Sequence, residues 1–361
     1  MDPVRFGLIG YGAWGSHHAR AVAETPSAEL VCIAARSESA QLAARETHPH
    51  AVVVADYHEL LQRDDIDVVD IVVPTHRHCE IACAALQSGR HVLLEKPMAA
   101  TEADCRRILA MAEQFERKLA IGFELRMSRL WGRVRELIRQ GAIGTPRYCM
   151  IELWRRPYRP GAGGWRFDRD RVGNWILEEP IHFFDLARWY LSESGEPTRV
   201  TARANSIDAS RPMLSDNFSA MLDFSDGAYA VISQTLAAFE HHQTAKVTGT
   251  QGAIWAAWSG AKDRTFEPEF FLRHLTGRRS TRSIVADLPE RSLSWCSRFS
   301  RFAIQCGTAA RCTLMGMMVC GPSRCAWLRN VRPVRGQVSC CPDWKRSRSG
   351  AGRSTRADQP G

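Results

Sequence analysis

The chain has 361 residues and a formal net charge of +9, and 45% of its residues are hydrophobic. This length is ample for two domains, and no apolar run reaches the roughly 18 residues that a membrane helix needs. Because no signal peptide precedes the first predicted strand, we expect a cytoplasmic protein with no membrane partner.

A glycine-rich turn lies near the start of the chain, between a predicted strand over Val4–Ile9 and a predicted helix over Ala13–Glu24. The turn consists of Gly10, Tyr11, Gly12, Ala13, Trp14 and Gly15. The first glycine permits a tight turn, the second lets the backbone approach a pyrophosphate, and the third allows close packing of the helix, whose N-terminus would hold the phosphates. We therefore expect these six residues to bind a dinucleotide. An ordinary glycine-rich turn is the alternative.

Strand and helix patterns alternate after this turn. Strands are predicted at Glu29–Ala34, Ile66–Val73, His91–Leu94 and Leu119–Phe123, and helices at Arg77–Ser88 and Thr101–Phe115. The last helix opens on Thr101 and Asp104, a pair typical of a capping box. Strands separated by helices form parallel units, so residues 1–122 are predicted to be a Rossmann domain with a doubly wound parallel sheet.

The end of the second strand bears on the choice of dinucleotide. An acidic residue there would bind the ribose 2′-hydroxyl of NAD, but the chain has Ala34, Ala35, Arg36 and Ser37. An arginine guanidinium group can bind a 2′-phosphate. We therefore expect Arg36 and Ser37 to contact the cofactor, and NADP to be favoured over NAD. The alternative is that Arg36 stacks on the adenine or lies in solvent.

Glu95, Lys96 and Pro97 directly follow the strand that ends at Leu94. Ligands bind at the carboxyl ends of parallel strands, so Lys96 can reach the binding crevice. Pro97 fixes φ and can adopt a cis peptide bond that aims the lysine at a substrate. The alternative is an ordinary solvated lysine in a loop.

The second half of the chain has the pattern of an α+β domain, predicted over residues 123–290. Strands are expected at Arg147–Trp154, Thr198–Ile207, Phe218–Phe224, Ala228–Gln234, Thr244–Gly249 and Ala253–Trp258. Hairpin turns at Asp226-Gly227 and Gln251-Gly252 predict a large open, mainly antiparallel sheet of five or six strands. Such a sheet packs on helices or offers one face to a partner subunit.

A helix is predicted at about Pro180 to Leu191. Glu178, His182 and Asp185 are spaced four and three residues apart, so on a continuous helix their side chains would share a face. One alternative is a carboxylate at a helix start beside a core histidine. A zinc site is another, but no third nitrogen or sulfur ligand is paired with them, and we predict no metal.

Residues 291–361 differ from the rest of the chain. They hold seven of the 12 cysteines and thirteen Lys and Arg against two Asp, so this segment has a net charge of +11 and residues 1–290 one of −2. The segment has neither regularly spaced aromatic residues nor a helical period, so we expect no nucleic-acid partner. Its composition matches an out-of-frame reading of a G+C-rich gene. We expect a disordered or out-of-frame tail, with a basic interaction arm as the alternative.

Together these motifs resemble the Gfo/Idh/MocA family (glucose-fructose oxidoreductase, inositol dehydrogenase and rhizopine catabolism proteins) over about residues 3 to 290. The motifs are the glycine turn, the 74–78 segment, Glu95-Lys96-Pro97, and the stretch from Gly173 to Asp185. The resemblance implies that Lys96 and His182 are catalytic, with Glu178 where the family often has aspartate. It also implies homo-oligomers that pair through the open sheet. Further cofactor contacts are expected at Pro74, Thr75, His78, Glu95, Lys96, Trp165 and Arg166; a surface loop is the alternative for the last two.

The function that this resemblance implies is NAD(P)-dependent oxidation of a secondary hydroxyl of a polyol, sugar or inositol. His182 would take the hydroxyl proton, because its unperturbed pKa lies near neutrality. Lys96 would hydrogen-bond the same oxygen, and Glu178 would orient His182 or hold a neighbouring hydroxyl. The alternative is a non-catalytic dinucleotide-binding regulator of the same fold, which requires neither Lys96 nor His182.

Overall fold

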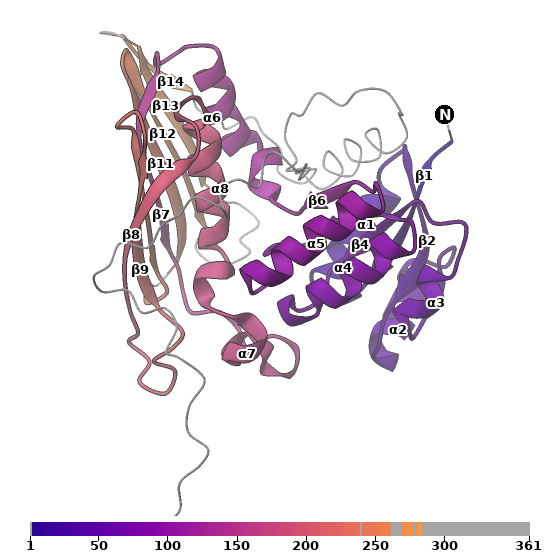
Figure 1. Ribbon diagram of the computed structural model, residues 1–361. Coiled ribbons are helices and arrows are strands. Elements are labelled where there is room, and N and C mark those ends of the chain that lie inside the picture. The colour runs from indigo at the N-terminus through magenta and orange to yellow at the C-terminus, as the bar shows by residue number, and fades with distance from the viewer. Residues whose placement is uncertain (1, 239, 261–268, 277–278, 284–361) are drawn as a thin grey trace, which may run out of the picture.

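The computed structural model describes residues 2–238, 240–260, 269–276 and 279–283 (Figure 1). Within them the chain forms two sheets, one of six strands and one of eight. Residues 291–361 lie outside the described residues. The structure therefore does not test the prediction that this tail is disordered or out of frame. Among the described residues, no helix has the length and apolarity to cross a lipid bilayer.

The first sheet is entirely parallel and has the order β3-β2-β1-β4-β5-β6. Its strands are β1 (Val4–Ile9), β2 (Ala28–Ala34), β3 (Val52–Val54), β4 (Val68–Ile71), β5 (His91–Leu94) and β6 (Leu119–Ile121). The strands are apolar and largely buried because helices cover both faces, as in other parallel sheets. The predicted Rossmann sheet is confirmed, although β3 was not predicted.

Helices cover the two faces of this sheet. They are α1 (Gly15–Ala23), α2 (Glu38–Thr47), α3 (Tyr57–Leu61), α4 (His78–Gln87) and α5 (Glu102–Gln114). On one face α1 and α2 pack against Phe6 and Leu8, and on the other α3, α4 and α5 pack against Ile71. Thr101 caps α5 by accepting a hydrogen bond from the Asp104 N–H at 3.1 Å. The predicted helix start is therefore confirmed, whereas α2 and α3 were not predicted.

The second sheet is antiparallel except for one parallel pair, and it has the order β14-β13-β12-β11-β7-β10-β9-β8. Its strands are β7 (Pro146–Trp154), β8 (Pro197–Asn205), β9 (Asn217–Phe224), β10 (Tyr229–Thr235), β11 (His241–Gly249), β12 (Gly252–Gly260), β13 (Glu269–Thr276) and β14 (Arg279–Ser283). The expected open, mainly antiparallel sheet is confirmed. It is larger than the five or six strands predicted, since β13 and β14 were missed.

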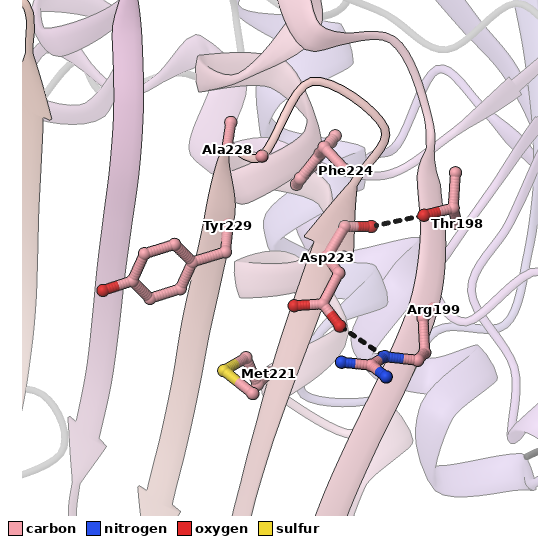
Figure 2. Close-up of a pocket in the computed structure, with 8 residues that line it drawn as sticks. Thr198, Arg199, Met221, Asp223, Phe224, Ala228 and Tyr229 are labelled. Atoms are coloured by element: carbon pink, nitrogen blue, oxygen red, sulfur yellow. Dashed lines mark hydrogen bonds and ion pairs between the residues drawn. The ribbon is translucent and has the colours of Figure 1, made fainter.

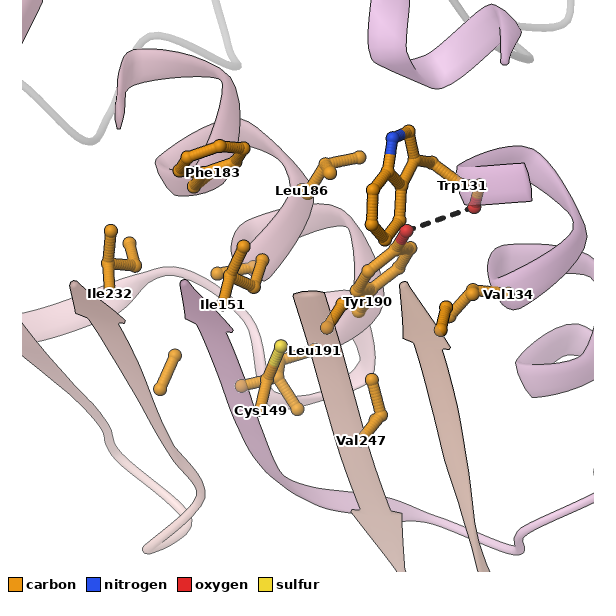
Figure 3. Close-up of a cluster of buried hydrophobic side chains, with 14 of the residues drawn as sticks. Trp131, Val134, Cys149, Ile151, Phe183, Leu186, Tyr190, Leu191, Ile232 and Val247 are labelled. Atoms are coloured by element: carbon orange, nitrogen blue, oxygen red, sulfur yellow. Dashed lines mark hydrogen bonds between the residues drawn. The ribbon is translucent and has the colours of Figure 1, made fainter. Parts of the chain in front are cut away.

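One face of the second sheet is covered by α6 (Arg129–Arg139) and α8 (Pro180–Tyr190), which lie between this sheet and the parallel-sheet half (Figure 1). Side chains alternate along β9, β10 and β11, so the inner set packs on these helices (Figure 3). The Tyr190 hydroxyl donates to the Trp131 carbonyl oxygen at 3.0 Å and links α8 to α6. The outer face exposes large apolar side chains, including Trp154, Tyr229 and Trp255.

Short segments complete the connections. They are η1 (Thr75–Arg77), η2 (Glu124–Met127), η3 (Ala162–Phe167), α7 (Arg169–Val172), η4 (Trp175–Leu177) and η5 (Ser192–Ser194). Four of them, η1 to η4, contain or directly precede residues of the candidate site.

Candidate active site

The glycine turn joins β1 to α1. Gly10 has a φ of +101°, and a Cβ atom there would come within 2.2 Å of the Val72 carbonyl oxygen. A Cβ atom at Gly15 would lie 1.9 Å from the Gly10 carbonyl oxygen, whereas one at Gly12 would meet no heavy atom within 4 Å. Only glycine fits the first and third positions. The second leaves the backbone accessible beside the start of α1, so these residues fit a dinucleotide phosphate.

The remaining side chains of the turn have different surroundings. Tyr11 is buried, with its ring edge-on to His48 at 5.9 Å between centroids. Ala13 is exposed, and Trp14 is 37% exposed. Tyr11 is therefore part of the packing under the turn, whereas Ala13 and Trp14 lie where a ligand can reach them.

Ala35, Arg36 and Ser37 follow β2. Ala35 is buried, and Arg36 is exposed and makes no hydrogen bond or ion pair with any described residue. The pKa of His76 is lowered mainly by burial and then by the charges of Arg171 and Arg77. The charge of Arg36 adds a smaller lowering. Ser37 accepts a hydrogen bond from the Ala40 N–H at 3.3 Å and caps α2. Arg36 is thus available to a ligand at the carboxyl end of β2, while Ser37 also has a structural role.

Pro74, Thr75 and His78 lie after β4. Thr75 is 3% exposed, and His78 is 1% exposed. His78 Nδ1 lies 2.7 Å from the Pro97 carbonyl oxygen, and its Nε2 lies 2.8 Å from the Val73 carbonyl oxygen. Both ring nitrogens therefore face backbone acceptors. The contacts favour a structural role for His78, which ties the Pro97 loop to β4.

Glu95 and Lys96 follow β5, and the Lys96–Pro97 peptide bond is cis. The Lys96 ammonium group donates to the backbone carbonyl oxygen of Glu178 in the other half of the chain. Lys96 therefore reaches the start of α8, as its position after a parallel strand predicts. Glu95, in contrast, is buried at 5% exposure, and its Oε2 accepts a hydrogen bond from the Lys96 N–H at 3.2 Å. Its carboxylate lies beneath the lysine.

Glu178 lies before α8, which begins at Pro180. The prediction of a shared helix face for Glu178 and His182 is therefore wrong, because proline occupies the first helical position and the helix starts after Glu178. Asp185 does lie on α8, but it accepts two hydrogen bonds of 2.6 Å from the Arg126 guanidinium group and is buried. This buried pair joins η2 to α8, and within the described part of the chain Asp185 makes no hydrogen bond or ion pair with His182.

Trp165 and Arg166 lie in η3, the glycine-rich segment predicted to reach over the cofactor. Arg166 Nε donates to Glu178 Oε2 at 2.7 Å, and the guanidinium group lies 4.8 Å from the Trp165 ring centroid. The Arg166 carbonyl oxygen accepts a hydrogen bond from Trp175 Nε1 at 2.8 Å. These contacts hold the segment against the Glu178 side chain, whereas Lys96 contacts the Glu178 main chain.

His182 lies in the first turn of α8 and is 3% exposed. Its Nε2 lies 3.2 Å from Glu124 Oε1, and its Nδ1 has no hydrogen-bond partner among the described residues. Burial lowers the pKa of His182 from 6.5; the charge of Glu124 opposes this change, and the charge of Lys96 reinforces it. The imidazole is therefore neutral at neutral pH and keeps one unprotonated ring nitrogen.

Glu124 and Glu179 were missed by the sequence reasoning. Glu179 pairs with Arg155 at 2.5 Å, with His241 Nε2 at 3.0 Å and with Gln243 Nε2 at 2.8 Å. Burial raises the pKa of Glu179, but Arg155 and His241 outweigh it and hold the pKa well below 4.5. Because Glu179 directly precedes Pro180, this network fixes the start of α8 on β11.

Two other kinds of ligand site bear on this cluster. No group of three or more His, Cys, Asp or Glu in the described part of the chain is arranged to hold a metal ion. A shallow hollow on the second sheet is lined by Thr198, Arg199, Asp223 and Tyr229 (Figure 2), and Arg199 Nε pairs with Asp223 there at 2.6 Å. The hollow contains none of the predicted site residues.

Two family models match the chain. The model described as oxidoreductase family, NAD-binding Rossmann fold, matches residues 4–123, and the Gfo/Idh/MocA C-terminal domain model matches residues 131–255. Inositol 2-dehydrogenase of Rhizobium meliloti is 32% identical over 260 residues, which cover 70% of this chain and 75% of that protein.

Inositol 2-dehydrogenase of Salmonella typhimurium is 30% identical over 200 residues, which cover 55% of this chain and 57% of that protein. The matched region therefore spans little more than half of the Salmonella enzyme. Among solved structures, the aldose-aldose oxidoreductase from Caulobacter crescentus matches with a TM-score of 0.71 at 22% identity, covering 84% of this chain and 90% of the other. At that identity the likeness shows the fold alone.

Proposed function

The chain belongs to the Gfo/Idh/MocA oxidoreductase family, and on that premise we propose that it is an NAD(P)-dependent dehydrogenase acting on a secondary hydroxyl of a polyol, sugar or inositol. The observation that carries the proposal is the approach of Lys96 to the start of α8. Lys96 donates a hydrogen bond to the carbonyl oxygen of Glu178, and its positive charge lowers the pKa of His182. A proton acceptor and a cation therefore lie near one another, as the oxidation of an alcohol requires.

The substrate hydroxyl would lie between Lys96 and His182. His182, which is neutral because burial lowers its pKa, would take the hydroxyl proton. Lys96 would donate a hydrogen bond to the same oxygen and stabilise the negative charge that develops on it. When bound, the nicotinamide would supply the hydride acceptor. Glu178, held by Arg166, would accept a hydrogen bond from a neighbouring hydroxyl and orient the substrate.

The dinucleotide would lie along the glycine turn, with its phosphates near Gly12 and the start of α1. Arg36, exposed at the end of β2, would bind a 2′-phosphate, and the absence of a carboxylate at Ala35 removes the usual partner of the NAD ribose. We therefore favour NADP over NAD. Pro74 and Thr75 would contact the cofactor from the loop after β4, and Trp165 from η3.

We also propose that residues 1–122 and 123–290 form two domains and that the protein is cytoplasmic. It would form a homo-oligomer that pairs through the outer face of the second sheet. The exposed Trp154, Tyr229 and Trp255 support such a pairing, since large exposed apolar patches mark interaction surfaces.

The test is a dehydrogenase screen. The purified full chain is mixed with myo-inositol, other polyols or aldoses and with NAD or NADP, and the absorbance of the reduced nicotinamide is followed. Turnover of a polyol or sugar that is lost in Lys96→Ala and His182→Ala supports the proposal. Tight dinucleotide binding without turnover of any of these compounds would favour the non-catalytic regulator instead.

A further inference from the structure

A buried charge cluster lies in the parallel-sheet half, beneath the glycine turn and Lys96. It consists of His18 on α1, Asp70 on β4 and Glu95 after β5, whose exposed fractions are 0%, 0% and 5%. The three residues come from adjoining elements, since β4 lies between β1 and β5 in the sheet. The chemistry proposed above uses none of their side chains.

His18 bridges the two carboxylates of this cluster. Its Nδ1 lies 2.8 Å from Asp70 Oδ2, and its Nε2 lies 3.2 Å from Glu95 Oε1. The contact with Asp70 has hydrogen-bond geometry. The contact with Glu95 is a close approach of a ring nitrogen to a carboxylate oxygen. Burial lowers the pKa of His18, but Asp70 and Glu95 outweigh burial, and the pKa is raised above 6.5. His18 therefore lies between two carboxylates that favour its protonated form.

Glu95 extends the connection to Lys96. Its Oε1 faces His18, while its Oε2 accepts the hydrogen bond from the Lys96 backbone N–H at 3.2 Å. At the other end, His18 lies in the first turn of α1, which begins at Gly15, the last glycine of the turn. A chain of short contacts therefore runs from the turn that fits a dinucleotide phosphate to the peptide group of Lys96.

We propose that His18 is a positioning residue, whose ring fixes the Glu95 carboxylate so that Glu95 fixes the Lys96 peptide. The placement of the lysine is thereby coupled to the dinucleotide turn, because α1 cannot shift without moving His18. Asp70 anchors the ring from β4 through Nδ1, and Nε2 faces the Glu95 carboxylate. The catalytic consequence rests on the proposed function of Lys96, whereas the positioning itself does not.

The first test reads the position of Lys96 without any substrate. The full chain is treated with an amine-acylating reagent, and labelling of Lys96 is measured by peptide mass spectrometry relative to Lys118. His18→Asn keeps a donor near Asp70 but cannot reach Glu95, and Glu95→Gln removes the charge. In both variants the Lys96 to Lys118 labelling ratio should rise by about threefold or more, because a lysine released from its hydrogen bonds reacts faster. His50→Asn, an exposed histidine of the same half, is the control and should leave the ratio unchanged.

Adding NADP should lower the labelling ratio in the parent chain and lower it less in His18→Asn, since the link to the turn is broken. Thermal unfolding is measured for each variant. If His18→Asn does not fold, Glu95→Gln carries the comparison. An unchanged ratio in a folded His18→Asn or Glu95→Gln protein overturns the proposal.

The second test is a double-mutant cycle on kcat. His18→Asn should lower kcat by about tenfold in the parent but by no more than about twofold in a Lys96→Ala background, because its effect acts through the lysine. If His18→Asn lowers kcat by the same factor in both backgrounds, His18 supports the fold in general and the proposal is wrong. If the parent turns over no polyol or sugar, the proposed function fails while the labelling experiment still decides the role of His18.

Discussion

The ammonium group of Lys96 donates a hydrogen bond to the backbone carbonyl oxygen of Glu178, which joins the end of β5 to the segment before α8. The acceptor is a main-chain atom, so this contact depends on the path of the chain and not on the side chain at position 178. The Glu178 carboxylate is occupied separately, by Arg166. Substitutions of Lys96 and of Glu178 therefore test different parts of the site.

Glu178→Gln should lower kcat by about threefold to tenfold, because it keeps the main-chain contact with Lys96 and loses one charge-assisted hydrogen bond. The measurement is steady-state kinetics with the substrate found in the screen, with Arg166→Ala as the partner variant. A loss in Glu178→Gln as large as that in Lys96→Ala would show that the carboxylate itself acts on the reacting hydroxyl.

Lys96→Ala and His182→Ala should each lower kcat by about a hundredfold or more, the scale of general-base and electrostatic roles. Dinucleotide affinity, read by fluorescence titration, should change little, since neither side chain belongs to the glycine turn. The matched controls are Lys118→Ala and His50→Ala, which should retain activity. Normal turnover in both site variants would leave Lys96 and His182 as structural residues.

The pH profile should report His182. Its pKa is lowered from 6.5 by burial, so the neutral base persists below that value, and kcat/KM should fall only as the pH drops through the lowered pKa. The charge of Glu124 raises this pKa, so Glu124→Gln should move the acidic limb to lower pH. Glu196→Gln, in a surface pair with Arg188, is the control. A limb that moves to higher pH in Glu124→Gln would contradict the assignment.

Cofactor preference should depend on Arg36. The parent chain should bind NADP more tightly than NAD, and Arg36→Ala should narrow the difference by about tenfold, as expected for one charge-assisted contact. Ala35→Asp should move the preference toward NAD, because a carboxylate at this position can bind the ribose hydroxyls. Arg117→Ala, an exposed arginine of the same half, serves as the control. Equal affinities of the parent chain for NADP and NAD would contradict the proposed role of Arg36.

Glu179→Gln should destabilise the fold by about 2–3 kcal/mol, because it weakens the charge-assisted contact with the partly buried Arg155. Glu196→Gln, whose pair is exposed, should cost no more than about 1 kcal/mol. Since the pKa of Glu179 is held below 4.5, its contribution is present above pH 4.5 and is lost as the pH falls toward the folded-state pKa. Urea unfolding of both variants at several pH values measures this, and a cost for Glu179→Gln equal to that for Glu196→Gln would refute it.

Local signals were enough to predict the parallel sheet and the positions of Lys96 and His182. The glycine turn and the Glu95-Lys96-Pro97 motif each follow an apolar strand, and such strands and turns are encoded by neighbouring residues. The predicted β5 agrees with the observed strand, His91–Leu94. Both residues could be placed because each lies at the end of a predictable element, whereas their catalytic roles are a prediction that the family resemblance implies.

The contacts of these residues could not be predicted from local pattern. Glu124 meets His182 from a short segment without periodicity, and Glu179 meets His241 only because of the strand order of the second sheet. The prediction that Glu178 shares a helix face with His182 is wrong for a local reason, since the helix begins only at Pro180. Pairs so distant in sequence depend on tertiary packing, which spacing along one helix does not encode.

The parallel pairing of β7 with β10 has a consequence for how the protein folds. Parallel neighbours cannot be joined by a hairpin, so the chain must travel from the end of β7 back to the start of β10 before they pair. That crossover contains Glu178, His182 and all of α8. Long-range pairings of this kind form late, after their loop-closure entropy has been overcome. We therefore expect His182 to reach its final surroundings in the same cooperative step that completes the centre of the second sheet.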